Sequence, residues 1–535
     1  MITRRHLIRN SLAAFTATTL AGCEMRSARK IPGRLVDSGA SLGHHLRDGK
    51  TPPPDATRRA RVVIAGGGIA GLAAARALRK AGIEDVLLIE ALDEVGGNSS
   101  YGRNTVSAYP WGAHYVPLVR KDCRPVLELF SDLKIIVDED AQGRPVYDEY
   151  CLSADPQERL WMYGRWQDGL VPQLGNSASD NAQFAAFFAE TERLKNLMGA
   201  DGKPVFAIPI DSSSADPDWR ALDSMTFSAY LAQRGWRSPR LHWYVNYCCR
   251  DDYGTTVETV SAWAGLHYFA ARNGVSANAD PSSVLTWPDG NGHLVREIAR
   301  QGAAQVQRNS VVTRVGKARE GVIVDYFDGA TQRTTRVEAA AAVVCLPRFI
   351  AARVVEGVES AGLETFTYAP WMVANVTLSH LPEGRGQPLS WDNVIYDSSL
   401  LGYVVATHQD LRQYVRETVI TYYWPLSETE PKDARKVALT RSLEDWQGYV
   451  TRDLLRVHPE LVGHVENIDV RVWAHAMIRP TPGFIWGEVR TKAGAHRPPL
   501  FFAHSDLSGV SIFEEAYCRG SEAGQLAAKH LTAPT

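Results

Sequence analysis

The stretch "RVVIAGGGIAGLAAARALRKAG", residues 61–82, places a β-branched run, a cluster of glycines and a segment of helical period one after another. This order predicts a strand, a tight glycine turn and a helix, the opening unit of a Rossmann-type fold. The glycines permit the turn, let the backbone approach a pyrophosphate and let the helix pack close to the strand. The helix N-terminus adds free N–H groups and the positive end of its dipole. The sequence therefore predicts a dinucleotide site formed by Gly66, Gly68, Ile69, Ala70 and Gly71.

The acid that ends the next predicted strand marks the ribose end of this site. The strand "DVLLIE" ends in Glu90, 24 residues after Gly66, where a carboxylate can accept hydrogen bonds from both ribose hydroxyls. The same charge would repel a 2′-phosphate, so a phosphorylated ribose is disfavoured. A second glycine pair then looks like the second phosphate-contacting loop of FAD enzymes of the glutathione-reductase type, which NAD dehydrogenases normally lack. FAD is therefore expected, with further contacts from Glu90, Ala91, Gly96, Gly97 and Asn98.

Length, charge and cysteine spacing narrow the class of protein. The chain has 535 residues, of which 45% are hydrophobic and 22% charged, enough for about two or three globular domains. The formal net charge of -2 supplies no basic field, so no nucleic-acid partner is expected. Beyond residue 23, the apolar runs fall short of the roughly 20 residues that cross a bilayer. The seven cysteines lack metal-type spacing, so neither a metal site nor a disulfide framework is expected.

The first 23 residues resemble an export signal. Arg4, Arg5 and Arg9 precede an apolar segment, and "TRRHLIR" resembles the twin-arginine consensus that directs folded proteins to export. The segment ends in "LAGC", which resembles the lipobox of bacterial lipoproteins and would make Cys23 the lipidated residue. A simple signal with a chance cysteine, or an apolar cytoplasmic N-terminus, is the alternative. The resemblance implies a periplasmic or cell-surface protein, held at the membrane by a lipid anchor, with the twin-arginine export machinery as a partner.

Four separated blocks resemble the flavin-containing amine oxidase superfamily, which includes monoamine, polyamine and L-amino acid oxidases. The blocks are residues 61–97, "YPWGAHYVP" at 109–117, residues 286–347, and "LFFAHSDLSGVSIFEEAYCRGSEAGQLAAKHL" at 500–531. The resemblance implies FAD, bound non-covalently because no cysteine matches the one that tethers flavin in monoamine oxidases. Further implied cofactor contacts are Gly112, Ala113 and His114 beneath the flavin ring, Val312 beside the adenosine, and Asp506 and Phe513 in the last block.

The same resemblance implies an α/β fold in which a Rossmann-like FAD-binding domain of the glutathione-reductase type carries an inserted α+β substrate domain. The FAD-binding domain is expected to be discontinuous, and residues 24–57, polar and basic with a proline triplet, are expected to form a tether or wrapping arm after the signal. The expected boundaries are 1–23 for the signal, 24–57 for the tether, 58–125 with 283–350 and 485–535 for the FAD-binding domain, and 126–282 with 351–484 for the substrate domain.

Asn375 is the departure from the family pattern that bears most on chemistry. It stands where many members have a lysine that hydrogen-bonds through water to flavin N5 and is implicated in the reaction with oxygen. Asparagine can hold a water but has no charge to stabilise developing superoxide. A dehydrogenase that passes electrons to a quinone or redox protein is thus expected at least as much as an oxidase that uses oxygen. Asn98, His504 and Glu515 also depart from the pattern and lessen the expected phosphate contacts.

Aromatic and acidic side chains are the candidates for the substrate site. Trp391, Tyr403 and Phe513 could surround an amine, and Asp392 could hold the far ammonium of a diamine or polyamine. Ordinary aromatic packing in a sheet is the alternative. The sequence therefore favours an FAD-dependent amine oxidoreductase. An amino-acid-oxidising or phytoene-desaturase-like flavoenzyme remains open, as does a degenerate flavoprotein that serves as a surface binding module.

Overall fold

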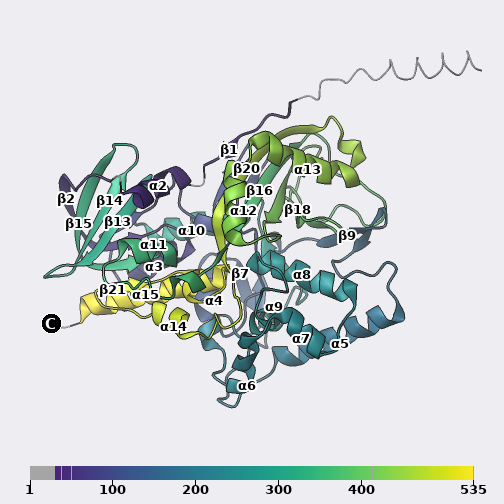
Figure 1. Cartoon of the computed structure of the whole chain (residues 1–535), viewed down its shortest axis with the longest axis horizontal. Helices are drawn as coiled ribbons and strands as arrows, with labels where there is room; N and C mark the ends of the chain where they lie inside the picture. Colours follow the sequence, from purple (N-terminus) through teal and green to yellow (C-terminus); the bar gives the residue numbers. More distant parts are fainter. Residues whose placement is uncertain (1–29, 38, 50, 413, 534–535) are drawn as a thin grey trace, which may run out of the picture.

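The computed structural model describes residues 30–37, 39–49, 51–412 and 414–533, so the expected signal and Cys23 lie outside the described residues. The first large sheet has the strand order β12-β3-β2-β15-β14-β13, with β21 beside β15 (Figure 1). Strands β12, β3, β2, β15 and β21 pair in parallel, whereas β13, β14 and β15 form an antiparallel meander. The bounds are β2 (Ala56–Ala65), β3 (Val86–Ile89), β12 (Gln305–Gln307), β13 (Ser310–Lys317), β14 (Val322–Asp328), β15 (Arg333–Val344) and β21 (Leu500–Phe502).

Strands β3 and β21 and the last four residues of β2 and of β15 are buried, as the β-branched run "RVVIA" predicts for β2. Helices α3 (Ile69–Lys80), α10 (Gly292–Gly302) and α15 (Phe513–Thr532) pack together over the sheet. Helix α15 can approach α3 closely because Gly520 and Gly524 carry no side chain. A β-carbon at either position would be too close to a backbone oxygen of α3. The C-terminal block thus lies beside the glycine loop.

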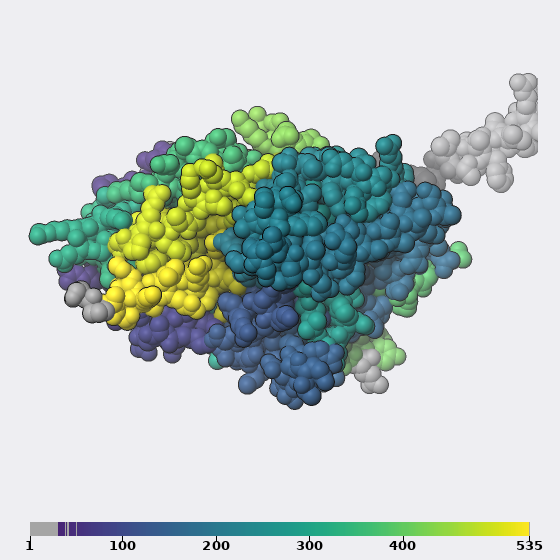
Figure 2. Space-filling model, turned by 90° about the horizontal axis from the view of Figure 1, so that it is seen from below, coloured from purple at the N-terminus to yellow at the C-terminus, as the bar shows by residue number. Residues whose placement is uncertain are grey.

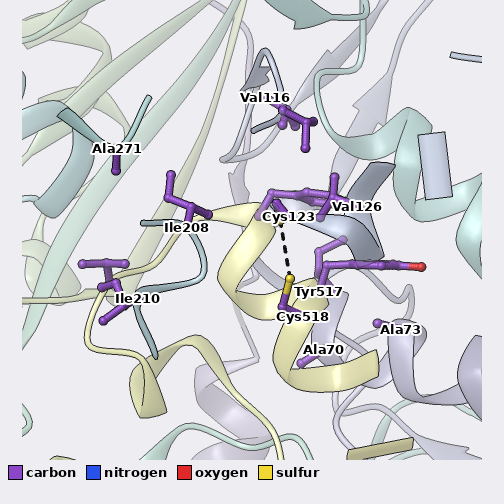
Figure 3. Packing of buried hydrophobic residues seen from close by; sticks show 14 of the residues in the cluster. Ala70, Ala73, Val116, Cys123, Val126, Ile208, Ile210, Ala271, Tyr517 and Cys518 are labelled. Atoms are coloured by element: carbon purple, nitrogen blue, oxygen red, sulfur yellow. Dashed lines mark hydrogen bonds between the residues drawn. The ribbon is translucent and has the colours of Figure 1, made fainter. Parts of the chain in front are cut away.

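Figure 3 shows this packing from close by, with Ala70 and Ala73 of α3 near Tyr517 and Cys518 of α15. The thiol of Cys518 contacts the thiol of Cys123, with 3.7 Å between the two sulfur atoms. Cys123 immediately precedes α4 (Arg124–Asp132), so α15 joins the glycine helix to the segment that follows the second block. Both cysteines are buried and free.

The second large sheet has the order β1-β20-β16-β19-β18-β17-β9-β10. Helices α12 and α13 lie on one side of it, and α5 to α9 form a helical layer below (Figure 1). Seen from below, this helical layer lies beside the C-terminal segment (Figure 2). The bounds are β1 (Leu35–Val36), β9 (Glu158–Met162), β10 (Arg165–Asp168), β16 (Tyr368–Leu378), β17 (Asp392–Ile395), β18 (Gly402–Val405), β19 (Thr418–Pro425), β20 (Val465–Ile478), α5 (Ala178–Lys195), α6 (Pro217–Arg220), α7 (Phe227–Gln233), α8 (Pro239–Tyr253), α9 (Ala262–Ala270), α12 (Pro431–Thr440) and α13 (Leu443–Val457).

Smaller elements connect the two sheets. They are β4 (Tyr101–Arg103), β5 (Ala108–Pro110), β6 (Tyr115–Pro117), β7 (Ile136–Glu139), β8 (Pro145–Tyr147), β11 (Val284–Thr286), α11 (Arg348–Val354) and α14 (Glu488–Ala493). Strands β6 and β11 pair, which brings the second and third sequence blocks together. No helix in the described part of the chain is long and apolar enough to span a membrane.

The segment expected to form a tether or wrapping arm carries regular elements in its described part. Residues 35–36 add strand β1, in parallel, to the edge of the second sheet beside β20, and residues 40–48 form helix α2 (Ala40–Asp48). Polar composition suggested a solvated linker, but the exposed edge of β20 offers backbone partners that composition does not reveal. A tether and a wrapping arm were both expected, and the described part of this segment forms a wrapping arm.

Candidate functional site

The glycine loop between β2 and α3 has three distinct environments. Gly66 has φ of +99°, and a β-carbon on it would lie 2.5 Å from the carbonyl oxygen of Cys345. A β-carbon on Gly71 would collide with the carbonyl oxygen of Gly66. At Gly68, by contrast, no described atom lies within 4 Å of the place a β-carbon would take. Gly66 and Gly71 therefore serve the fold, whereas Gly68 borders open space at the N-terminus of α3, beside Ile69 and Ala70.

Glu90 follows β3 and lies against the same loop. Its carboxylate accepts hydrogen bonds from the N–H groups of Gly67 at 2.7 Å and Leu92 at 2.9 Å. Burial raises the pKa of Glu90. Gly96 donates to the carbonyl of Gly67 at 2.8 Å, so the second glycine loop is joined to the first. An ionised carboxylate has about four acceptor positions, which leaves Glu90 capacity for ribose hydroxyls.

The segment Gly112–Ala113–His114 runs beside this second loop and is held from several sides. The N–H of Ala113 donates to the carbonyl of Asn98 at 2.8 Å, and the Tyr423 hydroxyl donates to the carbonyl of Gly112 at 3.0 Å. The hydroxyl of Thr286 donates to the carbonyl of His114 at 2.7 Å. A β-carbon on Gly112 would collide with Asn98. Residues 112–114 are partly exposed, so this fixed backbone is available to a flat ligand.

A cavity of about 390 Å³ lies next to His114, lined by strands of the second sheet and by residues of α8 and α9. The imidazole of His114 stacks on Tyr423 with 4.5 Å between ring centres, and Trp391 lies 5.6 Å from it. Burial lowers the pKa of His114 to about 4, so the ring is neutral at physiological pH. Aromatic side chains form much of the wall: Tyr115, Tyr247, Tyr268, Phe269, Trp391 and Tyr423.

Three carboxylates face this cavity: Glu158 of β9, Asp251 of α8 and Asp392 of β17. Burial raises the pKa of all three, and the charge of neighbouring acids raises each further. For Asp251 the pKa rises to about 7, and for Asp392 it rises well above the usual range. Glu158 and Asp392 are neighbours across the parallel pair of β9 and β17. Without a bound cation these three acids therefore resist full ionisation at neutral pH, and a positively charged ligand beside them would favour their charged forms.

The nearest cation is already paired. Arg272 lines the cavity, lies 4.3 Å from the centre of the Tyr268 ring and forms a buried ion pair with Asp252. Its guanidinium also donates to the hydroxyl of Tyr115 at 3.2 Å, and that hydroxyl lies 3.4 Å from the carboxylate of Asp251. Asp252 thus balances Arg272, and Lys195, the other cation among the described residues that line the cavity, pairs with Glu192 at 2.7 Å. The other three acids are left to ionise against a positively charged ligand.

The structure brings some predicted site residues together and leaves others apart. Trp391 and Asp392 line the cavity with His114. Tyr403 borders it only with its strand: its ring packs on Tyr422 and its hydroxyl lies 2.7 Å from His458, in a separate hydrophobic cluster. Asn375 does not line it: its amide donates to the carbonyl of Pro110 at 3.1 Å and accepts from the Thr421 hydroxyl at 2.7 Å. On β16 the residue paired with Tyr423 is Val373, two positions before Asn375.

Phe513 and Asp506 are also placed away from the cavity. Phe513 begins α15 and stacks on Phe130, 6.4 Å between ring centres. The carboxylate of Asp506 is buried and accepts from the hydroxyl of Tyr368 at 2.6 Å and the N–H of Arg348 at 2.9 Å. Val312 lies on β13, whose first residue, Ser310, donates to the carbonyl of Glu90 at 2.9 Å. Val312 is therefore close in the chain to the ribose end.

Glu158, Asp251, Arg272 and Tyr423 line the cavity but were absent from the residues expected from sequence. Asp251 had a usable signal, because "CCRDDYG" places two adjacent acids in a helix that is otherwise apolar on its inner face. The sequence around Glu158 carried no such signal, because its partner Asp392 is more than 200 residues away in sequence. Within the described residues, no group of three histidine, cysteine or acidic side chains is arranged to hold a metal ion.

The residues along this path fit a dinucleotide with a flat ring at one end. The open space at Gly68 suits a pyrophosphate, Glu90 suits a ribose, and the fixed backbone of residues 112–114 suits a ring. Asn98 donates its amide to the carbonyl of Ala476, so that side chain is used within the protein. The phosphate contacts thus rest on backbone N–H groups.

Comparisons with known proteins agree with this geometry. Residues 64–133 match the family model described as an NAD(P)-binding Rossmann-like domain. Over 111 residues the chain is 34% identical to polyamine oxidase 7 of Oryza sativa subsp. japonica. That match covers 19% of this chain and 23% of the rice protein, so the chain spans about a quarter of the curated relative that it matches.

Solved structures show the same fold over most of the chain. Putrescine oxidase bound to putrescine is 15% identical, with a TM-score of 0.61, and the match covers 88% of this chain and 98% of that one. Cyclohexylamine oxidase from Brevibacterium oxydans IH-35A is 16% identical, with a TM-score of 0.63 and coverage of 90% and 100%. A fatty acid isomerase from P. acnes has a TM-score of 0.59 at 16% identity, with coverage of 86% and 97%. The fold is thus a Rossmann-like domain with a substrate domain, and it is shared by proteins with different substrates.

Proposed function

We propose that the protein is an FAD-dependent oxidoreductase that oxidises amines carrying a second positive nitrogen, such as diamines and polyamines. The observation that carries this proposal is the cavity beside His114, where Glu158, Asp251 and Asp392 face an aromatic wall. The two cations among the described residues that line it, Arg272 and Lys195, already form ion pairs with other acids. The polyamine oxidase and putrescine oxidase relatives support the same class of substrate.

The cofactor would be held by the residues already placed along its path. Backbone N–H groups at the start of α3 would hold the pyrophosphate, Glu90 the ribose, and the backbone of residues 112–114 the ring. When bound, FAD supplies the acceptor for a hydride from the carbon next to the amine nitrogen. The protein binds the substrate, orients it and excludes water. No cysteine lines the cavity among the described residues, which is consistent with non-covalent binding.

The acids and the aromatic wall have complementary roles toward a diamine. A carboxylate that faces the cavity attracts the far ammonium and fixes how deep the chain enters. The reacting nitrogen must be neutral for its lone pair to assist C–H cleavage, and aromatic surroundings next to neutral His114 favour that form because they solvate charge poorly. The site thus distinguishes the two ends of one substrate.

The amino-acid alternative rests on Arg272, the one guanidinium among the residues lining the cavity. A carboxylate substrate would have to compete with Asp252 for it and would face three further acids, so this substrate class is disfavoured. An apolar chain, as in the desaturase-like alternative, would leave the same acids without partners.

Initial rates with an artificial electron acceptor test the substrate class. We expect putrescine and spermidine to be oxidised with kcat/KM at least about 100-fold above butylamine and above L-amino acids, the ratio that roughly 2.7 kcal/mol of ammonium binding supplies. Oxygen should replace the acceptor poorly, with little peroxide formed, because both Asn375, which matches the family lysine in sequence, and Val373, which pairs with Tyr423, are uncharged. Equal rates for butylamine and putrescine would remove the diamine proposal, and rapid peroxide release would remove the dehydrogenase proposal.

Export and anchoring belong to the same proposal. The twin-arginine and lipobox segments, which lie outside the described residues, support export of the folded, FAD-loaded protein and attachment at Cys23. A quinone or redox protein at the membrane would then be the electron acceptor. We expect Cys23→Ala to move the protein from the membrane fraction to the soluble periplasmic fraction, and Arg4→Lys with Arg5→Lys to keep it in the cytoplasm. Membrane attachment that survives Cys23→Ala would contradict the anchor.

A further inference from the structure

The described N-terminal arm, residues 30–37 and 39–49, is fastened first to the second sheet. The N–H of Ile468 donates to the carbonyl of Pro32, and the N–H of Val470 donates to the carbonyl of Arg34, both at 2.9 Å. Arg34 also forms an ion pair with Asp469 at 3.4 Å. The arm therefore starts as an ordered strand on β20 rather than as free chain.

A buried arginine then joins the arm to the second glycine loop. Arg471 of β20 is 6% exposed and donates to the carbonyl of Asp37 and to the hydroxyl of Ser100, each at 2.9 Å. Ser100 lies three residues after Gly97. One guanidinium thus fixes the arm, the substrate sheet and the second phosphate-contacting loop relative to one another.

The next part of the arm reaches the residues that flank the ribose acid. Gly39, with φ of +77°, packs on Leu92: a β-carbon there would lie 2.8 Å from a Leu92 methyl. Leu92 is the residue whose N–H donates to the carboxylate of Glu90. Helix α2 lies on the meander beside β13 (Figure 1), where His45 packs on Phe327 at 5.1 Å between ring centres.

We propose that this arm is part of the nucleotide-binding site and forms the outer wall of the half that takes the adenosine of a dinucleotide. The reason is positional: the arm packs on Leu92, two residues after Glu90, and on the β13–β14 meander, whose first residue Ser310 donates its N–H to the carbonyl of Glu90. An undocked arm would leave both neighbours of Glu90 freer to move, so the dinucleotide should leave faster. The proposal rests on the proposed FAD function and adds a site to it.

The rate of FAD release tests this wall in the full chain without any substrate. Leu46 on α2 is half-buried and packs on the core of the meander, whereas His44 on the same helix is exposed. We expect Leu46→Asp to release FAD about tenfold faster, measured by the rise in flavin fluorescence after dilution, as the loss of one leucine contact predicts. The matched control His44→Asp should release FAD at the wild-type rate. Equal rates for Leu46→Asp and wild type, or equally fast release by both variants, would overturn the proposal.

Reciprocity supplies a second test that needs no variant. If docking of the arm tightens FAD binding at equilibrium, bound FAD must stabilise the docked arm by the same factor. Trypsin should therefore cut after the exposed Arg47 several-fold faster in protein stripped of FAD than in loaded protein, while sites remote from the arm are cut equally. Equal rates of cleavage after Arg47 in FAD-loaded and FAD-free protein would overturn the proposal. A chain that takes up no FAD removes the proposed function as well, whereas unchanged release and cleavage remove only the arm's role.

Discussion

Gly68→Val is expected to weaken FAD binding by at least ~100-fold, about 2.7 kcal/mol, while leaving the fold intact. The reason is that no described atom lies within 4 Å of the position that a β-carbon would take, and the backbone there has φ of -70°, which valine accepts. The side chain would instead fill the space in front of the α3 N-terminus. Equilibrium dialysis with FAD measures the loss, and the circular dichroism spectrum and Tm should match those of the wild-type protein stripped of FAD.

Gly71→Val is the control that separates cofactor loss from fold loss. Its β-carbon would collide with the carbonyl oxygen of Gly66, which cannot move without disturbing β2 and α3. We expect this variant to lose stability as well as FAD. Tight FAD binding by Gly68→Val would show that the phosphate lies elsewhere and would contradict the site described above.

Asp392→Asn is expected to lower kcat/KM for putrescine by about 100-fold, about 2.7 kcal/mol, within the range found when one member of a buried charge pair is removed. Butylamine, which has the same carbon chain but one nitrogen, should change by less than about threefold because it has no far ammonium to lose. Initial rates with the two amines give both numbers. A similar loss for both substrates would place Asp392 in the framework rather than in substrate recognition.

The same variant should be more stable than the wild-type protein. Burial and the charges of Glu158 and Asp251 raise the pKa of Asp392 in the folded state above its unfolded value. A carboxyl of this kind costs stability as pH rises from the unfolded pKa toward the folded one. Neutral asparagine removes that cost, so Tm at pH 8 should rise while diamine oxidation falls.

The cofactor half of the molecule could be predicted from sequence because its signals are local. A strand, a glycine turn and a helix follow one another within residues 61–82, and sterics alone assign Gly66 and Gly71 to the positions they occupy. The substrate half depends on contacts between distant segments. Glu158 meets Asp392 only because β9 pairs with β17, and α8 adds Asp251 from a third segment. No window of sequence contains that arrangement.

Asn375 and the N-terminal arm show that tertiary contacts determine environments that a local sequence pattern does not contain. Asn375 was expected at the reacting centre, yet its amide forms hydrogen bonds with Pro110 and Thr421. The β16 residue paired with Tyr423 is Val373. A shift of two positions along a strand keeps a side chain on the same face, so the alternation of the strand could not reveal it. The arm was expected to be a tether or wrapping segment, and only the free edge of β20 decides between the two.

The central claim is tested most directly by the visible spectrum of the purified full chain under anaerobic conditions. The protein should be yellow, with its flavin released by denaturation, and putrescine added in equimolar amount should bleach the flavin band before any oxygen enters. Butylamine at the same concentration should leave the band unchanged on that timescale. A colourless protein that takes up no FAD, or a yellow one that no amine bleaches, would contradict the account.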